Sequence, residues 1–289
     1  MGILTQLNRA MAYIEEHIED DLALGDVPSV AAYSAFHFGR LFYYIADMPL
    51  SEYIRKRKLS LAAMELQSSD VKVIDLAMRY GYDSADSFTR AFARQHGVTP
   101  SAARKAGVNL TIFPPLTFQI KIKGVQAMNW RIEEKEAFEV FGIERTIKNV
   151  LNPDEAGELT AFWKEAHANG SCRRLIAQGG RSDLMGFGGY VDEQADECPY
   201  MICLIADPGC NTSGFQLASV PAASWAVFRS DEFDENPHGR ELRILFRRAY
   251  TEWFSTSGYD RFPGPDLEVY GMTDSGKYYE EAWIPVTKA

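Results

Sequence analysis

The sequence has no long apolar run, and basic residues are outnumbered by acidic ones. A membrane helix needs about 18 or more consecutive apolar residues, and none occur. Acidic residues interrupt the first stretch, MGILTQLNRAMAYIEEHIEDD, where a secretory signal requires an apolar core. We therefore expect a cytoplasmic protein without a membrane partner.

Metal-binding and catalytic patterns are also missing. The four cysteines form no CxxC pair and have no histidine at metal-ligand spacing; they are Cys172, Cys198, Cys203 and Cys210. We interpret them as reduced structural thiols and predict no metal and no cofactor. Since no Ser-His-Asp or Cys-His set is recognisable either, we predict that the protein is not an enzyme.

The charge is unevenly distributed. The formal net charge of −10 argues against a general polyanion binder. Residues 50–107, however, carry 10 Lys and Arg against 6 Asp and Glu, whereas residues 108–289 carry 18 against 27. A nucleic-acid surface is therefore expected within residues 50–107.

The apolar periodicity divides the chain at the same place. Residues 4–106 show helical spacing broken by turn signals, which predicts an all-α domain over 1–107. Residues 108–289 alternate in several stretches, which predicts an α+β domain with an antiparallel sheet. The expected elements are a hairpin around Lys123-Gly124, strands at 138–146, 184–192, 200–207, 215–230 and 278–286, and helices at 158–169 and 238–254. Strand, helix and strands occur twice, which indicates a pseudo-repeat.

The stretch RYGYDSADSFTRAF predicts a helix-turn-helix. Gly81 ends one short helix, Asp83 or Ser84 caps the next, and Phe88 and Phe92 face inward at i, i+4. The outward face then presents four residues to a DNA major groove, namely Ala85, Asp86, Thr89 and Arg90.

A second unit of the same design lies about 50 residues earlier. Ser34 is its expected cap, and Phe38 and Phe42 turn inward. Phe36, Gly39 and Arg40 turn outward. A helix over SEYIRKRKLSLAAMELQ joins the two units, so one chain offers two reading heads for adjacent major grooves, which are about 34 Å apart.

These segments resemble a known family. AYSAFHFGRLF, MPLSEYIRKRKLSLAAMEL and VIDLAMRYGYDSADSFTRAFARQHGVTPSAARK are similar to the double helix-turn-helix domain of the AraC/XylS transcription regulators, over residues 8–106. DLEVYG, YYEEAWIPV and EWFSTSGY resemble GyrI-like effector-binding domains. The domain order is similar to that of the Rob regulator. The resemblance implies a sequence-specific regulator that binds double-stranded DNA and a small-molecule effector, with RNA polymerase as a further candidate partner.

The resemblance also implies roles for individual residues. The family's base-contacting positions correspond to Phe36 and Arg40 in the first unit. In the second unit they correspond to Ala85, Asp86, Thr89 and Arg90. Arg90 is suited to guanine O6 and N7. Thr89 is suited to the backbone or a thymine methyl, and Asp86 either accepts from cytosine N4 or caps the helix. Ala32 and Asp47 stand where the family usually has glycine.

Contacts to DNA phosphates require hydrogen-bond donors that reach the DNA backbone, and they do not depend on the identity of the bases. The candidates are Ser51, Arg55, Lys56, Arg94, Thr99 and Lys105, with Ser51 and Thr99 placed before helix starts. The alternative is that the run Arg55 to Lys58 is a solvated helix face.

Glu281 is the main candidate for effector binding. On a strand, Tyr279, Glu281 and Trp283 share one face, where a carboxylate beside aromatic rings would favour a lipophilic cation. The resemblance implies the same glutamate. Further residues expected to line the effector-binding cleft are Trp163, Tyr190, Phe228 and Tyr270. The alternative is an edge-strand carboxylate in water, with these aromatics in the core.

Two other functions remain open at this stage. The first is an architectural DNA-binding protein whose second domain contacts another protein. The second is a GyrI-like hydrolase of small electrophilic compounds fused to a DNA-binding domain, with Glu281 and Tyr190 or Tyr279 as the acid and the tyrosine.

Overall fold

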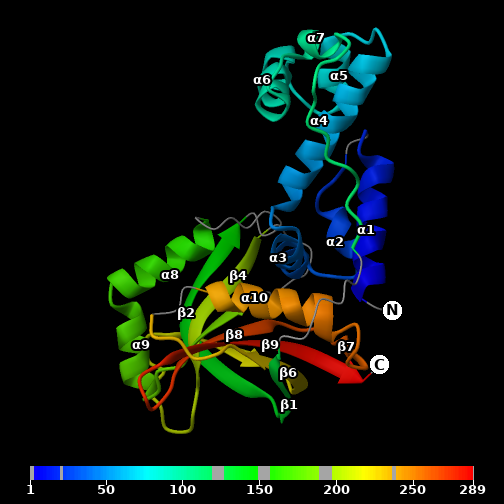
Figure 1. Ribbon diagram of the computed structural model, residues 1–289. Coiled ribbons are helices and arrows are strands. Elements are labelled where there is room, and N and C mark those ends of the chain that lie inside the picture. The colour runs from blue at the N-terminus through cyan, green and yellow to red at the C-terminus, as the bar shows by residue number, and fades with distance from the viewer. Residues whose placement is uncertain are drawn as a thin grey trace.

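The computed structural model describes residues 3–19, 22–118, 127–148, 157–188, 197–235 and 239–288. Its first part is helical (Figure 1). The helices are α1 (Ile3–His17), α2 (Asp26–Val30), α3 (Ala35–Ala46), α4 (Leu50–Ser68), α5 (Val73–Arg79), α6 (Ala85–His96) and α7 (Pro100–Ala103). Among the described residues, no helix has both the length and the hydropathy of a membrane span.

Both helix-turn-helix units form as the sequence predicts. Ser34 caps α3 by accepting a hydrogen bond from the backbone N–H of His37, and Ser84 caps α6 in the same way. Behind these caps, a pair of phenylalanines at i, i+4 faces the core of each unit without exposed surface: Phe38 and Phe42, and Phe88 and Phe92. The caps and the apolar pairs set the helix starts and the inward faces.

The two units belong to different hydrophobic cores. The buried residues of α1, α2, α3 and the first turns of α4 form one cluster with those of the second domain. The rest of α4 forms a separate cluster with α5, α6 and α7. Figure 1 shows the consequence: α3 lies beside α10, whereas α5, α6 and α7 stand at the far end of α4, away from the sheet.

The segment after α7 returns along α4. Three backbone amides attach it: Phe113 N donates to Ser60 Oγ (2.9 Å), Leu116 N to Tyr53 Oη (2.9 Å) and Phe118 N to Asn8 Oδ1 (2.8 Å). Residues 111–118 are therefore an ordered strap between the two parts of the chain. The domain boundary after residue 107 stays a prediction.

The second part is an antiparallel sheet with helices. Its strands are β1 (Asn129–Lys135), β2 (Phe138–Lys148), β3 (Leu184–Gly188), β4 (Glu197–Ile205), β5 (Gln216–Val220), β6 (Ala223–Arg229), β7 (Tyr259–Arg261), β8 (Asp266–Met272) and β9 (Tyr278–Lys288). Its helical segments are α8 (Glu158–Ala168), α9 (Ser171–Gly179), α10 (Arg240–Arg248) and a π-helical turn, η1 (Ala249–Trp253).

The sheet order confirms the pseudo-repeat. In the described ranges the order is β1-β6-β9-β8-β3-β4-β2-β5, with β7 on β9. The arrangement of β2, β3 and β4 with α8 and α9 mirrors that of β6, β8 and β9 with α10. The two halves meet where β3 pairs with β8, so Gly186 lies opposite Glu268 at the centre of the sheet.

The sheet has two apolar faces. The face with Phe141, Tyr200 and Phe228 packs with α8, α9 and α10. The other face carries a second cluster around Trp225 and Trp283. Because side chains alternate along a strand, Glu268 and Ala282 lie on the helix face, whereas Glu281 and Trp283 lie on the opposite one.

Several details differ from the sequence prediction. The segment expected as one strand at 215–230 is two strands, β5 and β6, because the backbone turns at Pro221. The pattern did not predict α9, the short β7 or β8. The first arm of the predicted hairpin reaches into residues 119–126, which lie outside the described residues, and its second arm, β1, pairs with β6.

Candidate nucleic-acid interface and effector site

The N-terminal half of α6 forms an accessible face. Asp86 and Arg90 are exposed on the side opposite Phe88 and the core, and Ala85 and Thr89 are half-buried on the flank of the helix. The sequence predicted this orientation from the i, i+4 spacing of the phenylalanines. The helix α6 itself stands at the outer end of the molecule, away from the second domain (Figure 1).

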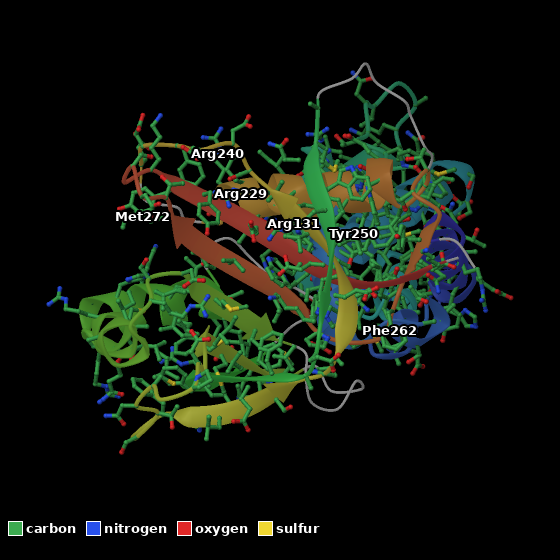
Figure 2. All side chains as sticks on the ribbon, turned by 90° about the horizontal axis from the view of Figure 1, so that it is seen from below. Arg131, Arg229, Arg240, Tyr250, Phe262 and Met272 are labelled. Carbon is green, nitrogen blue, oxygen red and sulfur yellow. The ribbon has the colours of Figure 1, made fainter. Side chains whose placement is uncertain are left out.

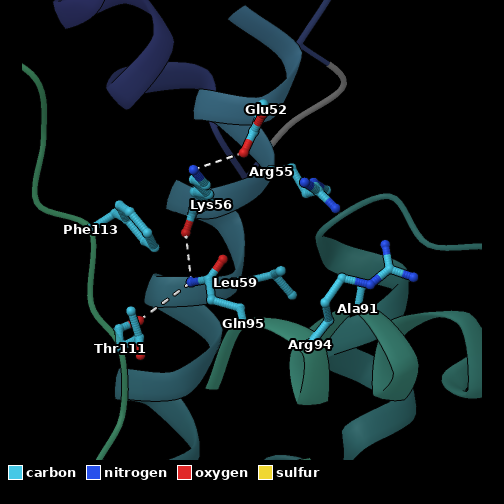
Figure 3. A pocket seen from close by; sticks show the side chains of 9 residues that line it. All are labelled: Glu52, Arg55, Lys56, Leu59, Ala91, Arg94, Gln95, Thr111 and Phe113. Atoms are coloured by element: carbon cyan, nitrogen blue, oxygen red, sulfur yellow. Dashed lines mark hydrogen bonds and ion pairs between the residues drawn. The ribbon is translucent and has the colours of Figure 1, made fainter. Parts of the chain in front are cut away.

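Three predicted phosphate-binding residues line one pocket between α4 and α6 (Figure 3). The cavity measures about 280 Å³ and is lined by Arg55 and Lys56 from α4 and by Arg94 from α6. Lys56 Nζ is 2.7 Å from Glu52 Oε1 and lies over the ring of Phe113, 4.9 Å from its centroid. Cations from two helices therefore converge on a groove next to the reading face.

The other phosphate candidates are more scattered. Thr99 caps α7, with its hydroxyl accepting from the Ala102 N–H at 3.4 Å, and Lys105 is exposed after that helix. Ser51 is not a cap, because α4 begins at Leu50 and its N-cap is Pro49. The predicted position of Ser51 before a helix start was therefore wrong by two residues.

The outward face of the first helix-turn-helix unit meets the second domain. Arg40 lies on α3, and its Nη2 donates to Glu268 Oε1 of the second domain and to Tyr44 Oη. Its side chain is 14% exposed. Arg40 thus points away from the core of its own unit, as expected, but it faces the second domain and cannot reach a base edge while it contacts Glu268. The side chain of Phe36 lies outside the described residues.

Two turns of this unit hold a residue other than glycine in the left-handed conformation that glycine favours. Ala32 and Asp47 adopt positive φ angles of 60° and 57°. Left-handed conformations cost a residue with a Cβ about 1 kcal/mol or more. At Asp47 the side chain gains ion pairs, since it meets Arg243 and Arg247 of α10 (Oδ2 to Arg247 Nη1, 3.3 Å).

Glu268 is the centre of a buried polar cluster on the helix face of the sheet. Its side chain is 3% exposed. Its Oε2 accepts hydrogen bonds from Tyr200 Oη (2.8 Å) and Tyr270 Oη (3.1 Å). Trp163 Nε1 donates to Tyr200 Oη (3.1 Å), and the Trp163 ring lies 4.8 Å from that of Tyr270. The pKa values of the Tyr200 and Tyr270 phenols are raised well above the usual value for tyrosine. Burial is the larger cause, and the charge of Glu268 is the second.

A glycine makes this cluster possible. Gly186 faces Glu268 across the β3–β8 pair, and the Tyr200 hydroxyl lies where a Cβ at position 186 would stand. Any other residue would occupy the space of the hydroxyl. The absent side chain at 186 therefore lets Tyr200 reach across the strand to the carboxylate.

Glu281 has a different environment from the predicted one. It is buried on β9, between β6 and β8, and not on an edge strand. Two arginines contact its Oε1, Arg131 (3.1 Å) and Arg229 (3.4 Å), and Trp283 Nε1 donates to its Oε2 (2.8 Å). Figure 2 labels both arginines on this side of the sheet. Two arginines thus contact Glu281, whereas one arginine, Arg40, contacts Glu268.

The aromatic residues predicted to line the effector site fall into three groups. Trp163 and Tyr270 come together at Glu268. Phe228 is a core residue with no exposed surface, packed edge-on against Trp253 beneath η1, as the alternative interpretation held. Tyr190 lies outside the described residues. Sequence analysis missed Glu268 although the quoted DLEVYG contains it, and alternation in that segment puts Glu268 and Tyr270 on one face.

The cysteines take part in neither site. Cys172, Cys198 and Cys203 are buried thiols, and Cys210 is half-buried. Burial raises the pKa of Cys172 to about 11, which keeps it protonated at neutral pH. Within the described ranges, no group of three His, Cys, Asp or Glu residues could hold a metal ion.

Comparison with known proteins matches both parts of the chain. A helix-turn-helix domain family matches residues 29–106, and the integron-associated effector binding protein family matches residues 131–286, which is more than half of the chain. The HTH-type transcriptional activator AarP of Providencia stuartii is 38% identical over 98 residues, or 34% of this chain and 73% of AarP. The chain belongs to the AraC/XylS family of transcription regulators. Its second domain is of the GyrI-like effector-binding type.

Two further similarities describe this regulator. The regulatory protein SoxS of Escherichia coli K12 is 39% identical over 94 residues, which cover 32% of the regulator and 88% of SoxS. The solved structure of SAV2435 bound to tetraphenylphosphonium covers 55% of the regulator and 94% of that chain, with 17% identity and a TM-score of 0.44. The two family matches and the similarity to AarP confirm the family predicted from the sequence. The helical first part and the antiparallel sheet of the second part confirm the predicted fold class.

Proposed function

We propose that the regulator binds a lipophilic cation at Glu268 and reads operator bases through α6, without a catalytic step. The buried carboxylate of Glu268 carries this proposal. A carboxylate with 3% exposure needs a partner charge and hydrogen bonds, because desolvation otherwise disfavours its ionised form. Tyr200 and Tyr270 supply hydrogen bonds to one oxygen, and a cation occupies the other.

The surroundings of Glu268 suit an aromatic or quaternary cation. Aromatic faces attract cations through the ring quadrupole, and the rings of Trp163 and Tyr270 lie beside the carboxylate. Glu281, by contrast, has two arginines at one oxygen, Arg131 and Arg229, whereas Glu268 has one, Arg40. This difference supports Glu268 as the cation acceptor in place of the residue that the sequence suggested.

DNA recognition is proposed for the exposed face of α6. Arg90 is the donor with the reach for guanine O6 and N7, and Ala85, Asp86 and Thr89 lie on the same face. Arg55, Lys56 and Arg94, with Thr99 and Lys105, supply phosphate contacts that set the orientation on the duplex. We further propose that the regulator acts on double-stranded DNA in the cytoplasm, with RNA polymerase as a partner, since its curated relatives are transcription regulators.

The Glu268→Gln variant tests the effector site. The substitution removes the charge and keeps the size, so the affinity for tetraphenylphosphonium should fall at least about tenfold, while binding of the neutral analogue triphenylphosphine oxide should change little. Isothermal titration calorimetry on the full chain measures both. The matched control is Glu281→Gln, which should leave cation affinity within about twofold of the wild type. Equal losses for cation and neutral analogue would reject Glu268 as the acceptor.

A further inference from the structure

The face of α3 that a reading helix would present to DNA is docked on the effector domain. In the second unit the corresponding face of α6 is accessible, whereas α3 packs along α10 (Figure 1). Tyr44 of α3 and Phe246 of α10 are stacked, with centroids 5.5 Å apart and an interplanar angle of 12°. The first reading head is therefore covered by the domain that binds the effector.

Within this contact, Arg40 takes the place of a bound cation. Its guanidinium donates to Glu268 Oε1, while the phenols of Tyr200 and Tyr270 donate to Oε2. The Tyr44 and Phe246 rings lie 5.3 and 5.7 Å from the guanidinium carbon. A carboxylate on one side and aromatic rings around the charge are the features that a lipophilic cation would use.

The ion pairs that Asp47 and Arg40 make across the interface differ in burial. Asp47 is 50% exposed where it meets Arg243 and Arg247, and exposed ion pairs contribute little to stability. Arg40 and Glu268 are 14% and 3% exposed. Removing one partner of a buried pair leaves an uncompensated charge, which is strongly unfavourable. Consequently α3 can leave the effector domain readily only if another cation takes over Glu268.

Two cations cannot share this site easily. Both would have to approach the same carboxylate oxygen, and like charges at such separations repel each other in a poorly solvated environment. Binding of an external cation and docking of α3 are thus alternatives at a single acceptor. Glu268 has Arg40 as its partner when α3 is docked and the external cation when α3 is released. A ligand that binds only one of two states shifts the equilibrium toward that state, so cation binding is coupled to the position of α3.

We propose that Arg40 is an internal occupant of the effector site, and that a lipophilic cation displaces it from Glu268 and thereby releases α3 for DNA binding. This inference rests on the proposed function of Glu268. In the docked state only α6 of the two reading helices has its face accessible. After release, α3 supplies the second head for an adjacent major groove. By linkage, DNA that engages α3 tightens cation binding by the same factor.

Cation affinity in the absence of DNA tests the competition. Arg40→Ala removes the internal occupant, so the full chain should bind tetraphenylphosphonium at least about fivefold more tightly than the wild type, within the usual range of coupling factors. The matched control is Arg248→Ala, which deletes an arginine of α10 that pairs with Glu252 (3.0 Å) and donates to the carbonyl of Ala127 (3.3 Å). This control should bind like the wild type.

A second variant loosens the docking without touching Glu268. Asp47→Ala removes the ion pairs to Arg243 and Arg247, so it should also raise cation affinity, by less than Arg40→Ala does. The Asp47→Ala variant tests the competition for Glu268 if Arg40→Ala fails to fold. Hydroxyl-radical footprinting on a duplex selected from random sequences should show protection that extends from one major groove to two when tetraphenylphosphonium is added.

The possible results separate the two proposals. If Glu268→Gln weakens cation binding while Arg40→Ala and Asp47→Ala bind no more tightly than the wild type, the competition is refuted and the proposed function of Glu268 stands. If neither the wild type nor Arg40→Ala binds the cation, both proposals fail. A footprint that stays unchanged when the cation is bound refutes the release of α3.

Discussion

Replacing Gly186 by alanine tests whether the cluster around Glu268 is built as described. A Cβ at position 186 would overlap the Tyr200 hydroxyl oxygen and lie 2.7 Å from Glu268 Oε2. The Tyr200 ring has no exposed surface, and its hydroxyl is held between Trp163 and Glu268. The hydroxyl therefore cannot move away without breaking these hydrogen bonds.

The expected cost of Gly186→Ala follows from three contributions. Losing a hydrogen bond to a charged group costs about 1.5 to 3 kcal/mol. Overpacking a buried site adds about 1 to 3 kcal/mol. Replacing glycine by alanine recovers about 0.4 to 1 kcal/mol through the unfolded chain. We therefore expect a loss of about 2 to 5 kcal/mol in the free energy of unfolding of the effector domain, together with weaker binding of tetraphenylphosphonium.

Urea unfolding followed by tryptophan fluorescence measures this loss. The matched control is Gly25→Ala, since Gly25 has helical angles (φ −65°, ψ −21°) and nothing within 4 Å of an added Cβ. The control should change stability by less than about 1 kcal/mol. If Gly186→Ala and Gly25→Ala have the same unfolding midpoint and the same cation affinity, the close approach of Tyr200 over Gly186 is refuted.

Two further predictions concern DNA reading and pH. Arg90→Ala should relax base preference at one operator position by about 1 to 3 kcal/mol, whereas Lys56→Ala should weaken binding to all sequences and reduce the salt slope by about 1, as measured by binding to selected duplexes over a range of salt. Burial, then Arg261 and Arg40, hold the pKa of His37 well below its usual 6.5. Below pH 6.5 the unfolded chain therefore takes up a proton that the folded one does not, and at pH 5.5 this should cost about 1.4 kcal/mol of stability, which His37→Gln should abolish.

Each of these experiments has an internal reference. Lys277→Ala removes an exposed cation from the second domain and should leave both base preference and salt slope unchanged. Equal losses on every sequence for Arg90→Ala and Lys56→Ala would contradict their assigned roles, and binding that is indifferent to sequence in the wild type would favour an architectural protein. For His37, parallel stability curves of wild type and His37→Gln between pH 8 and pH 5.5 would contradict the described burial.

Local sequence signals predicted the helix-turn-helix units correctly. The serine caps and the phenylalanine pairs act within a few residues of each other, so their geometry follows from helix periodicity alone. The same holds for most strands, whose alternation identified the faces of β9. The prediction failed between β5 and β6, where one apolar stretch is divided at Pro221, and where a helix is short, as for α9.

The proposed effector site was predicted only in part, for a physical reason. Alternation showed that Glu281 shares a face with Trp283, but it did not reveal that Arg131 and Arg229 cover that face from other strands. Trp163 and Tyr270 were recognised as candidates. Their common partner, Glu268, was missed because its environment depends on the order of β8, β3 and β4 in the sheet.

The sequence by itself determined the helical reader, the antiparallel second domain and the outward residues of α6, because these depend on contacts between near neighbours in the chain. Tertiary structure alone decided which carboxylate is buried among phenols and where the outward face of α3 is placed. Arg40 and Glu268 are 228 positions apart. Periodicity indicates that a side chain leaves its own core, but the surface that it then meets depends on how the two domains pack together.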